Sequence, residues 1–111
     1  MNDEYEVARD LASHLGVDFL GQLMQALCGT ILETRQDLER AIAAQDAELA
    51  RQTAHRAKSG FGALGAVTAL GMAREIEERA TRGVIPSESE VSALVREAEA
   101  FVAGWCPVEK V

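Results

Sequence analysis

Apolar residues recur at helical spacing along most of the chain. The longest segment of this kind contains two heptad-spaced series, Leu20, Leu27 and Ala41 in one and Met24, Ile31 and Leu38 in the other. Heptad spacing is typical of the seam along which a helix packs against its neighbours in a bundle. The pattern therefore predicts a long helix from about 18 to 44.

Four further helices are expected from the same periodicity and from the residues that usually begin and end helices. They should cover about 3–14, from 46 to between 62 and 65, 66–82 and 87–104. The expected N-terminal signals are Asp46 and two capping boxes, Asp3 with Glu6 and Ser87 with Glu90. The expected stops are Gly16 and Gly83.

Composition favours helices over strands. Hydrophobic residues make up 48% of the chain, and it has only two prolines and few β-branched or aromatic residues. Short connections favour antiparallel neighbours, so we expect an all-α fold: an up-down antiparallel four-helix bundle over about 18–104, with an additional short N-terminal helix packed across one end. At 111 residues, the whole of 1–111 should form a single domain.

The charge pattern argues against two classes of partner. The net charge is −7 and there is no basic tract, so binding to nucleic acid is not expected. No run of eighteen apolar residues is present, and the acidic N-terminus does not resemble a signal peptide, so we expect no membrane association. Cys28 and Cys106 lack metal-ligand spacing, which fits reduced thiols in a cytoplasmic protein.

One histidine of the third expected helix lies on a strip with little side-chain bulk. The strip consists of Arg51, His55, Lys58, Ser59 and Gly62, which share one helix face because they are spaced three or four residues apart. The apolar residues of this helix fall on another face. The imidazole is therefore expected to point outward, beside a cation and open to approach.

The residues around His55 resemble the core of the histidine-containing phosphotransfer (HPt) domain family. The family pattern is roughly A-H-x-L-K-G-x-x-x-x-L-G-A, and the matching residues are Ala54, His55, Lys58, Leu64, Gly65 and Ala66. The chain departs from the pattern at Ala57, where Leu is usual, and at Ser59, where Gly is usual. Both replacements are small, so access to the imidazole should survive. The resemblance covers about 17–103.

The physical chemistry of this strip agrees with such a function. A phosphoryl group has to reach the imidazole from a partner, and bulk at i+4 or i+7 would block it; Ser59 and Gly62 occupy those positions. Glycines at 60, 62 and 65 are costly in or beside a helix, which a purely stabilising role does not explain. Lys58, one turn from the histidine, can neutralise phosphoryl charge as a mobile point charge.

The resemblance implies a relay of phosphoryl groups from Asp to His to Asp, with Nε2 of His55 as the acceptor. Glu77 falls at a position that lies near the histidine in related proteins, so it is a candidate for orienting the imidazole through its other nitrogen. The candidate docking residues are Arg51, Gln52, Ser59 and Gly62.

The partners implied by the resemblance are response-regulator receiver domains and a hybrid sensor kinase. The Mg²⁺ that screens the phosphoryl oxygens would come from the receiver, and no intrinsic cofactor or metal is expected. The sequence has no P-loop and no kinase glycine-rich loop. We therefore expect a phosphocarrier and not an enzyme that phosphorylates itself from ATP.

Two other functions fit part of the pattern. A non-phosphorylated helical adaptor could bind a receiver or kinase by the same face, although the pairing of His55 with Lys58 argues against it. The chain could also be the excised phosphotransfer module of a chemotaxis-type histidine kinase. The initial methionine and the complete set of helices favour a free-standing protein.

The remaining candidates for reactive side chains are assigned to ordinary roles. His14 is expected on the surface near a helix end, because it lies far from His55 and has no Cys or His at zinc-ligand spacing. Cys28 follows Leu27 on an apolar helix and is expected to be a small core residue.

Overall fold

The computed structural model describes residues 4–109 of the chain, and side chains over 4–105. Its regular elements are five helices: α1 (Glu6–Leu15), α2 (Val17–Ala44), α3 (Ala47–Leu64), α4 (Val67–Thr81) and α5 (Glu88–Glu109). The described residues contain no strand, so the fold is all-α as predicted. None of the described helices combines the length and the apolar character needed to cross a membrane.

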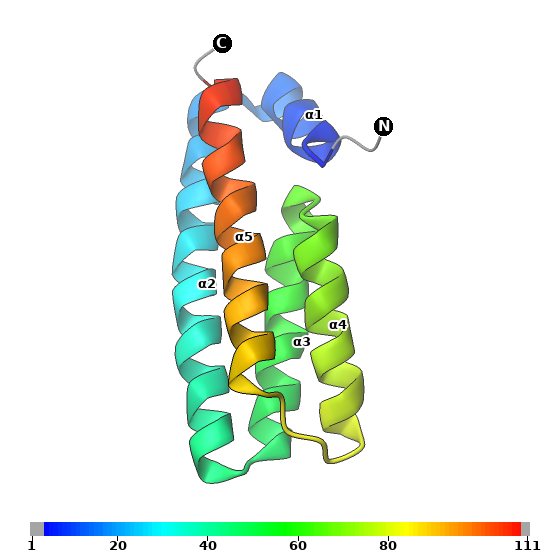
Figure 1. Cartoon of the computed structure of the whole chain (residues 1–111). Helices are drawn as coiled ribbons and strands as arrows, with labels where there is room; N and C mark the ends of the chain where they lie inside the picture. Colours follow the sequence, from blue (N-terminus) through cyan, green and yellow to red (C-terminus); the bar gives the residue numbers. More distant parts are fainter. Residues whose placement is uncertain (1–3, 110–111) are drawn as a thin grey trace.

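The four longer helices lie side by side, and successive helices run in opposite directions (Figure 1). α3 packs most extensively against α4, and α2 packs against both α3 and α5. The short helix α1 lies at one end of these helices, near the turn between α3 and α4 (Figure 1). This arrangement leaves one side of α3 and α4 available for a functional site.

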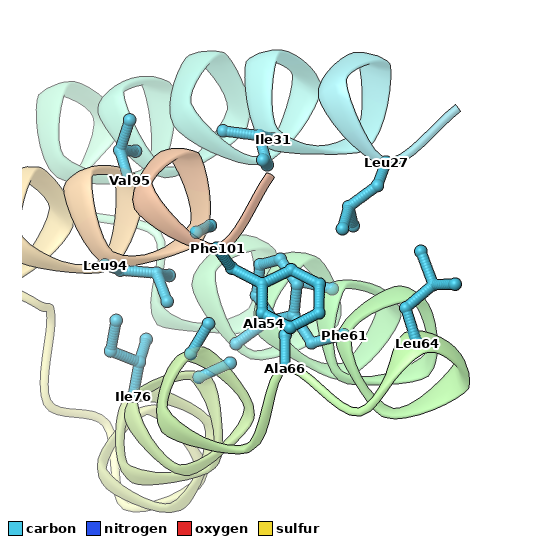
Figure 2. Close-up of a cluster of buried hydrophobic side chains, with 14 of the residues drawn as sticks. Leu27, Ile31, Ala54, Phe61, Leu64, Ala66, Ile76, Leu94, Val95 and Phe101 are labelled. Carbon is cyan, nitrogen blue, oxygen red and sulfur yellow. The ribbon is translucent and has the colours of Figure 1, made fainter. Parts of the chain in front are cut away.

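A single apolar core holds the helices together, and every helix contributes to it. Its largest fully buried side chains are Phe61, Leu20, Leu38 and Leu94. Figure 2 shows α3 residues such as Ala54 and Phe61 facing Ile76 and Leu94 across this core. Both heptad series predicted for α2 are buried, which confirms that interpretation of the sequence. Three of the six buried residues of α3 are alanines.

Short local signals define the ends of α3 and so fix where the histidine lies. The Asp46 side chain accepts a hydrogen bond from the backbone N–H of Leu49 at 3.0 Å, as an N-cap should. At the other end Gly65 adopts φ +77°, and the N–H of Ala66 donates to the Phe61 carbonyl at 2.9 Å. Glycine suits this left-handed position, so the predicted stop in 62–65 is confirmed.

The connection between α4 and α5 also forms as the sequence predicts. Gly83, two residues beyond the end of α4, has φ +84°. Ser87 and Glu90 make a reciprocal capping box: the N–H of Glu90 donates to Ser87 Oγ and the N–H of Ser87 donates to Glu90 Oε1, both at 3.1 Å. Arg79 of α4 then pairs with Glu90 at 2.6 Å, which ties the start of α5 to α4.

The N-terminal helix is attached to the rest of the molecule by an aromatic contact. The Tyr5 ring stacks on Phe101 with 4.8 Å between centroids, and its hydroxyl donates to the Phe101 carbonyl at 2.7 Å. Gly104 makes room for this ring, because a Cβ there would overlap the Tyr5 hydroxyl. A Cβ at Gly65 would likewise lie 2.7 Å from Cβ of Val7. Two glycines therefore let α1 approach both α5 and the α3–α4 turn.

Several expected boundaries and positions differ from the structure. α1 begins at Glu6 and not near residue 3, and the expected capping residue Asp3 lies outside the described residues. α5 continues beyond the expected end at Gly104 to Glu109, because burial of Trp105 keeps the chain helical past the glycine. Cys28 is exposed and not in the core, since one residue beyond Leu27 the helix has turned toward solvent.

Candidate functional site

His55 stands on the outer side of α3, near the middle of the helix. Its side chain is 63% exposed, whereas Ala54 and Ala57 on the neighbouring faces are buried in the core. The helical rotation between these positions explains the difference. The core contacts of α3 thus fix the backbone while the imidazole remains accessible, as the sequence predicts.

Glu77 of α4 holds one ring nitrogen of His55. Nδ1 of His55 lies 2.6 Å from Oε2 of Glu77. An ionised carboxylate only accepts hydrogen bonds, so Nδ1 must carry the proton in this contact. In the neutral imidazole the lone pair is then on Nε2, the nitrogen farther from Glu77. The contact therefore leaves Nε2 unprotonated in the neutral ring.

The second oxygen of Glu77 binds Lys58. The Lys58 ammonium lies 2.5 Å from Oε1 of Glu77, and the two side chains are 25% and 15% exposed. The hydrogen bond from Lys58 is the main cause that lowers the pKa of Glu77; partial burial opposes it, and the hydrogen bond from His55 adds to it. In the free protein α4 thus already engages the Lys58 side chain, a contact that the sequence did not predict.

Arg51 and Gln52, two candidate docking residues, lie one turn before His55 and share a partner. Nε of Arg51 lies 2.9 and 3.1 Å from the two carboxylate oxygens of Glu48, and Nε2 of Gln52 lies 3.4 Å from one of them. The hydrogen bond from Arg51 lowers the pKa of Glu48, and Glu48 in turn raises the pKa of Arg51. This network holds a charged group at the margin of the site.

Ser59 and Gly62 continue the exposed strip on the other side of the histidine. A Cβ built at Gly62 would come no closer than 4.0 Å to any neighbouring atom outside the local helix, the atom being Cδ2 of Leu70. Gly60 differs, because its Cβ would touch the Thr30 side chain of α2 at 3.4 Å. Gly60 therefore faces α2, whereas the small size of Gly62 leaves the outer surface open.

Sequence reasoning missed a further cation beside the histidine. Arg56 points toward α2, where its guanidinium lies 3.4 Å from the Asp37 carboxylate, and Arg40 also donates to Asp37. The position of Arg56, next to His55, was a signal of its nearness to the site. Its partner on α2 could not be identified, because the contact depends on how the two helices align.

Metal binding finds no support in the part of the chain whose side chains are described. No group of three or more His, Cys, Asp or Glu residues within it has the arrangement needed for a metal ion. His14 lies on the surface, as predicted, with Nδ1 2.8 Å from the carbonyl of Asp10.

Comparison with known proteins agrees with this geometry. The family model described as the Hpt domain matches residues 22–104. The crystal structure of histidine-containing phosphotransfer protein B (HptB) from Pseudomonas aeruginosa PAO1 is similar, with a TM-score of 0.72 and 30% identity over 94% of this chain and 87% of that chain. No curated protein sequence gives a significant match. The matched region contains the helix that carries His55, and the chain belongs to the Hpt domain family.

Proposed function

We propose that this histidine phosphotransfer protein relays a phosphoryl group from the aspartyl phosphate of one receiver domain to the aspartate of another, with His55 as the carrier. The observation that carries the proposal is the hydrogen bond of 2.6 Å between Nδ1 of His55 and Glu77. It leaves an unprotonated Nε2 on an exposed imidazole, which is the form that attacks phosphorus.

The reaction needs one bond to form and one to break. The Nε2 lone pair attacks the phosphorus, the P–O bond to the receiver's aspartate breaks, and that aspartate leaves as a carboxylate. The imidazole gains positive charge as the N–P bond forms, and the Glu77 carboxylate on Nδ1–H stabilises that charge. In the second half of the relay the receiver's aspartate attacks the phosphorus and Nε2 recovers its lone pair.

Lys58 has a second role in the proposal. In the free protein its ammonium is bound to Glu77 at 2.5 Å, one turn from the imidazole. When a phosphoryl group arrives, the flexible side chain can turn one of its donors to a phosphoryl oxygen. Lys58 then stabilises the phosphohistidine by charge, without needing a metal ion in this protein.

The receiver domain supplies the remaining components. Mg²⁺ held in its acidic pocket screens the phosphoryl oxygens during transfer, so this chain acts as a phosphocarrier without a cofactor or kinase activity of its own. The docking surface consists of Arg51, Gln52, Ser59 and Gly62 around the histidine. In this proposal a hybrid sensor kinase is the source of the phosphoryl group, and the relay takes place in the cytoplasm. The chain forms a single domain, an up-down four-helix bundle with an additional N-terminal helix.

Transfer from phosphorylated receivers tests this function directly. We expect the wild-type chain to take up acid-labile, base-stable phosphate that maps to His55, and the exposed substitution His55→Gln to abolish uptake with unchanged helicity. His14→Gln is the matched control and should accept phosphate normally. Phosphate on His14 would contradict the proposal, and receiver binding without any transfer would favour an adaptor instead.

A further inference from the structure

The helix α3 differs in charge from the other described helices. It contains three basic residues, Arg51, Arg56 and Lys58, against one acidic residue, Glu48. Each of the other four described helices contains more acidic than basic residues, and the whole chain carries a net charge of −7. The helix that bears His55 is therefore basic in an acidic protein.

Two of these cations lie on different sides of His55. α3 packs against both α2 and α4 and lies between them (Figure 1). Lys58 faces α4, where it binds Glu77. Arg56 faces α2, where its guanidinium lies 3.4 Å from the Asp37 carboxylate. A partner that approaches the imidazole therefore meets a cation on each side of it.

Arg56 can leave its carboxylate partner at little cost. Its side chain is 64% exposed, and exposed ion pairs contribute little to stability. Asp37 also accepts a hydrogen bond from Arg40 of its own helix, so the carboxylate stays paired when Arg56 turns away. The long arginine side chain ends in a planar group that binds a carboxylate through two parallel hydrogen bonds. Arg56 is thus able to exchange Asp37 for a carboxylate of another molecule.

The hollow beside Arg56 shows where such a carboxylate does not fit. The hollow lies between α2 and α3, measures about 380 Å³, and has Glu33, Asp37 and Arg56 as its charged lining residues. Two acidic side chains against one basic side chain disfavour a further carboxylate inside it. Arg56 therefore has to meet an acidic partner outside this hollow, on the surface that includes His55.

We propose that Arg56 is a docking residue for the receiver domain, which exchanges Asp37 for a carboxylate at the edge of the receiver's acidic, Mg²⁺-binding pocket, so that Asp37 restrains docking. This inference rests on the proposed function, which names the receiver as the partner. An acidic pocket attracts cations and is complementary to the basic helix α3. Arg56 sets the affinity for the receiver, whereas Lys58 acts on the phosphoryl group itself.

Substitutions of the two ion-pair partners should change receiver binding in opposite directions. We expect Arg56→Gln to raise the dissociation constant for a receiver about fivefold, the size of one exposed charge pair, and Asp37→Asn to lower it because Arg56 is released. The rate of phosphoryl uptake at saturating receiver should change much less than the dissociation constant. Arg56→Lys should keep part of the affinity. A purely structural ion pair predicts instead that both substitutions weaken binding.

Two matched variants separate this exchange from the loss of one charge. Arg35→Gln removes an exposed, paired arginine that lines a hollow between α2 and α5, so it should bind the receiver like wild type. Glu33→Gln removes a carboxylate one turn from Asp37 and leaves the contact of Arg56 with Asp37 in place. Asp37→Asn should therefore tighten binding more than Glu33→Gln does. Unchanged circular dichroism shows that each variant folds.

Binding and transfer are measured separately, so this inference and the proposed function can fail independently. If Arg56→Gln binds the receiver like wild type while the wild-type chain accepts phosphate, Arg56 is not a docking residue and the proposed function stands. If Asp37→Asn binds no more tightly than Glu33→Gln, the exchange is overturned. Wild-type binding without phosphate uptake overturns the proposed function, and weaker binding by Arg56→Gln then still supports docking through Arg56. A chain that binds no receiver overturns both.

Discussion

Glu77 engages two side chains of α3 at once, one with each carboxylate oxygen. Oε2 accepts from His55 at 2.6 Å and Oε1 from Lys58 at 2.5 Å. One residue therefore sets the tautomer of the proposed acceptor and also binds the lysine that we propose stabilises the phosphoryl group. Charge-assisted hydrogen bonds of this kind are stronger than neutral ones, so changes at these positions should be measurable.

The lysine should matter for the phosphorylated state and less for the fold. We expect Lys58→Ala to shorten the phosphohistidine half-life and to slow transfer several-fold, with a loss of at most about 1 kcal/mol in unfolding free energy. Lys58→Arg should keep part of the effect, since the charge remains but the planar group is differently hydrated. Higher salt should narrow the contrast between wild type and Lys58→Ala. If the phosphohistidine half-lives of wild type and Lys58→Ala are equal at low salt, Lys58 has no electrostatic role.

The carboxylate of Glu77 should make stability depend on pH in a predictable direction. Because the folded state lowers its pKa below the ordinary 4.5, the ionised form stabilises the protein above that value and the contribution is lost as pH falls through the lowered pKa. Glu77→Gln should therefore cost about 0.5–1.5 kcal/mol at pH 7 and clearly less near pH 3. Urea unfolding at both pH values measures this loss of unfolding free energy. A loss that is the same at pH 7 and pH 3 would contradict stabilisation by the ionised carboxylate.

The same substitution separates orientation from charge in transfer. In Glu77→Gln the new amide oxygen can still accept from Nδ1–H of His55, whereas Glu77→Ala removes the acceptor. We expect Glu77→Ala to slow phosphoryl uptake more than Glu77→Gln does. Single-turnover uptake from a phosphorylated receiver measures both rates. If the two variants are equally slow, and both slower than wild type, the charge of the carboxylate matters and the orientation of the ring does not.

At the scale of elements, the glycines in α3 and at its end lie in different environments. Gly60 sits against Thr30 of α2, and Gly65 ends the helix with a positive φ. Gly62 does neither, since it lies within the helix and its Cβ would meet only open surface beyond Leu70. This open surface at Gly62 agrees with the docking role that we propose for it.

Two substitutions at Gly62 test access without a change in fold. Gly62→Ala should stabilise the helix by up to about 1 kcal/mol and leave transfer nearly unchanged, because a methyl group is small. Gly62→Leu should keep the helix content and slow transfer from the receiver several-fold by covering the strip. The transfer rates of both variants, measured together with their circular dichroism, test this expectation. If Gly62→Leu transfers as fast as wild type, the docking surface lies elsewhere.

At the scale of the whole molecule, local features were predictable and contacts between distant segments were not. The caps at Asp46 and Ser87 depend on residues three positions apart, so the sequence shows them directly. The contact of Arg56 with Asp37 and that of Tyr5 with Phe101 depend on how helices align, which no local pattern encodes. Glu77 was identified only through resemblance to a family, and its ion pair with Lys58 was not predicted.

The contact between Tyr5 and α5 joins the two ends of the described chain, and it needs a glycine at position 104. Gly29 and Gly104 both lie inside helices, but a Cβ at Gly29 meets no atom within 4 Å, whereas one at Gly104 overlaps the Tyr5 hydroxyl. Gly29→Ala should therefore stabilise the protein by about 0.5–1 kcal/mol. Gly104→Ala gains the same helix propensity but displaces Tyr5 from Phe101.

The displaced tyrosine loses a hydrogen bond of 2.7 Å and a ring stack at 4.8 Å. These contributions are each about 0.5–1.5 kcal/mol, so Gly104→Ala should be less stable than Gly29→Ala by about 1–3 kcal/mol. Urea unfolding measures the difference, and hydrogen exchange should show faster exchange of the α1 amides in Gly104→Ala alone. If both alanines stabilise the protein equally, Tyr5 does not hold α1 to the bundle, because a contact that mattered would have opposed the added methyl group.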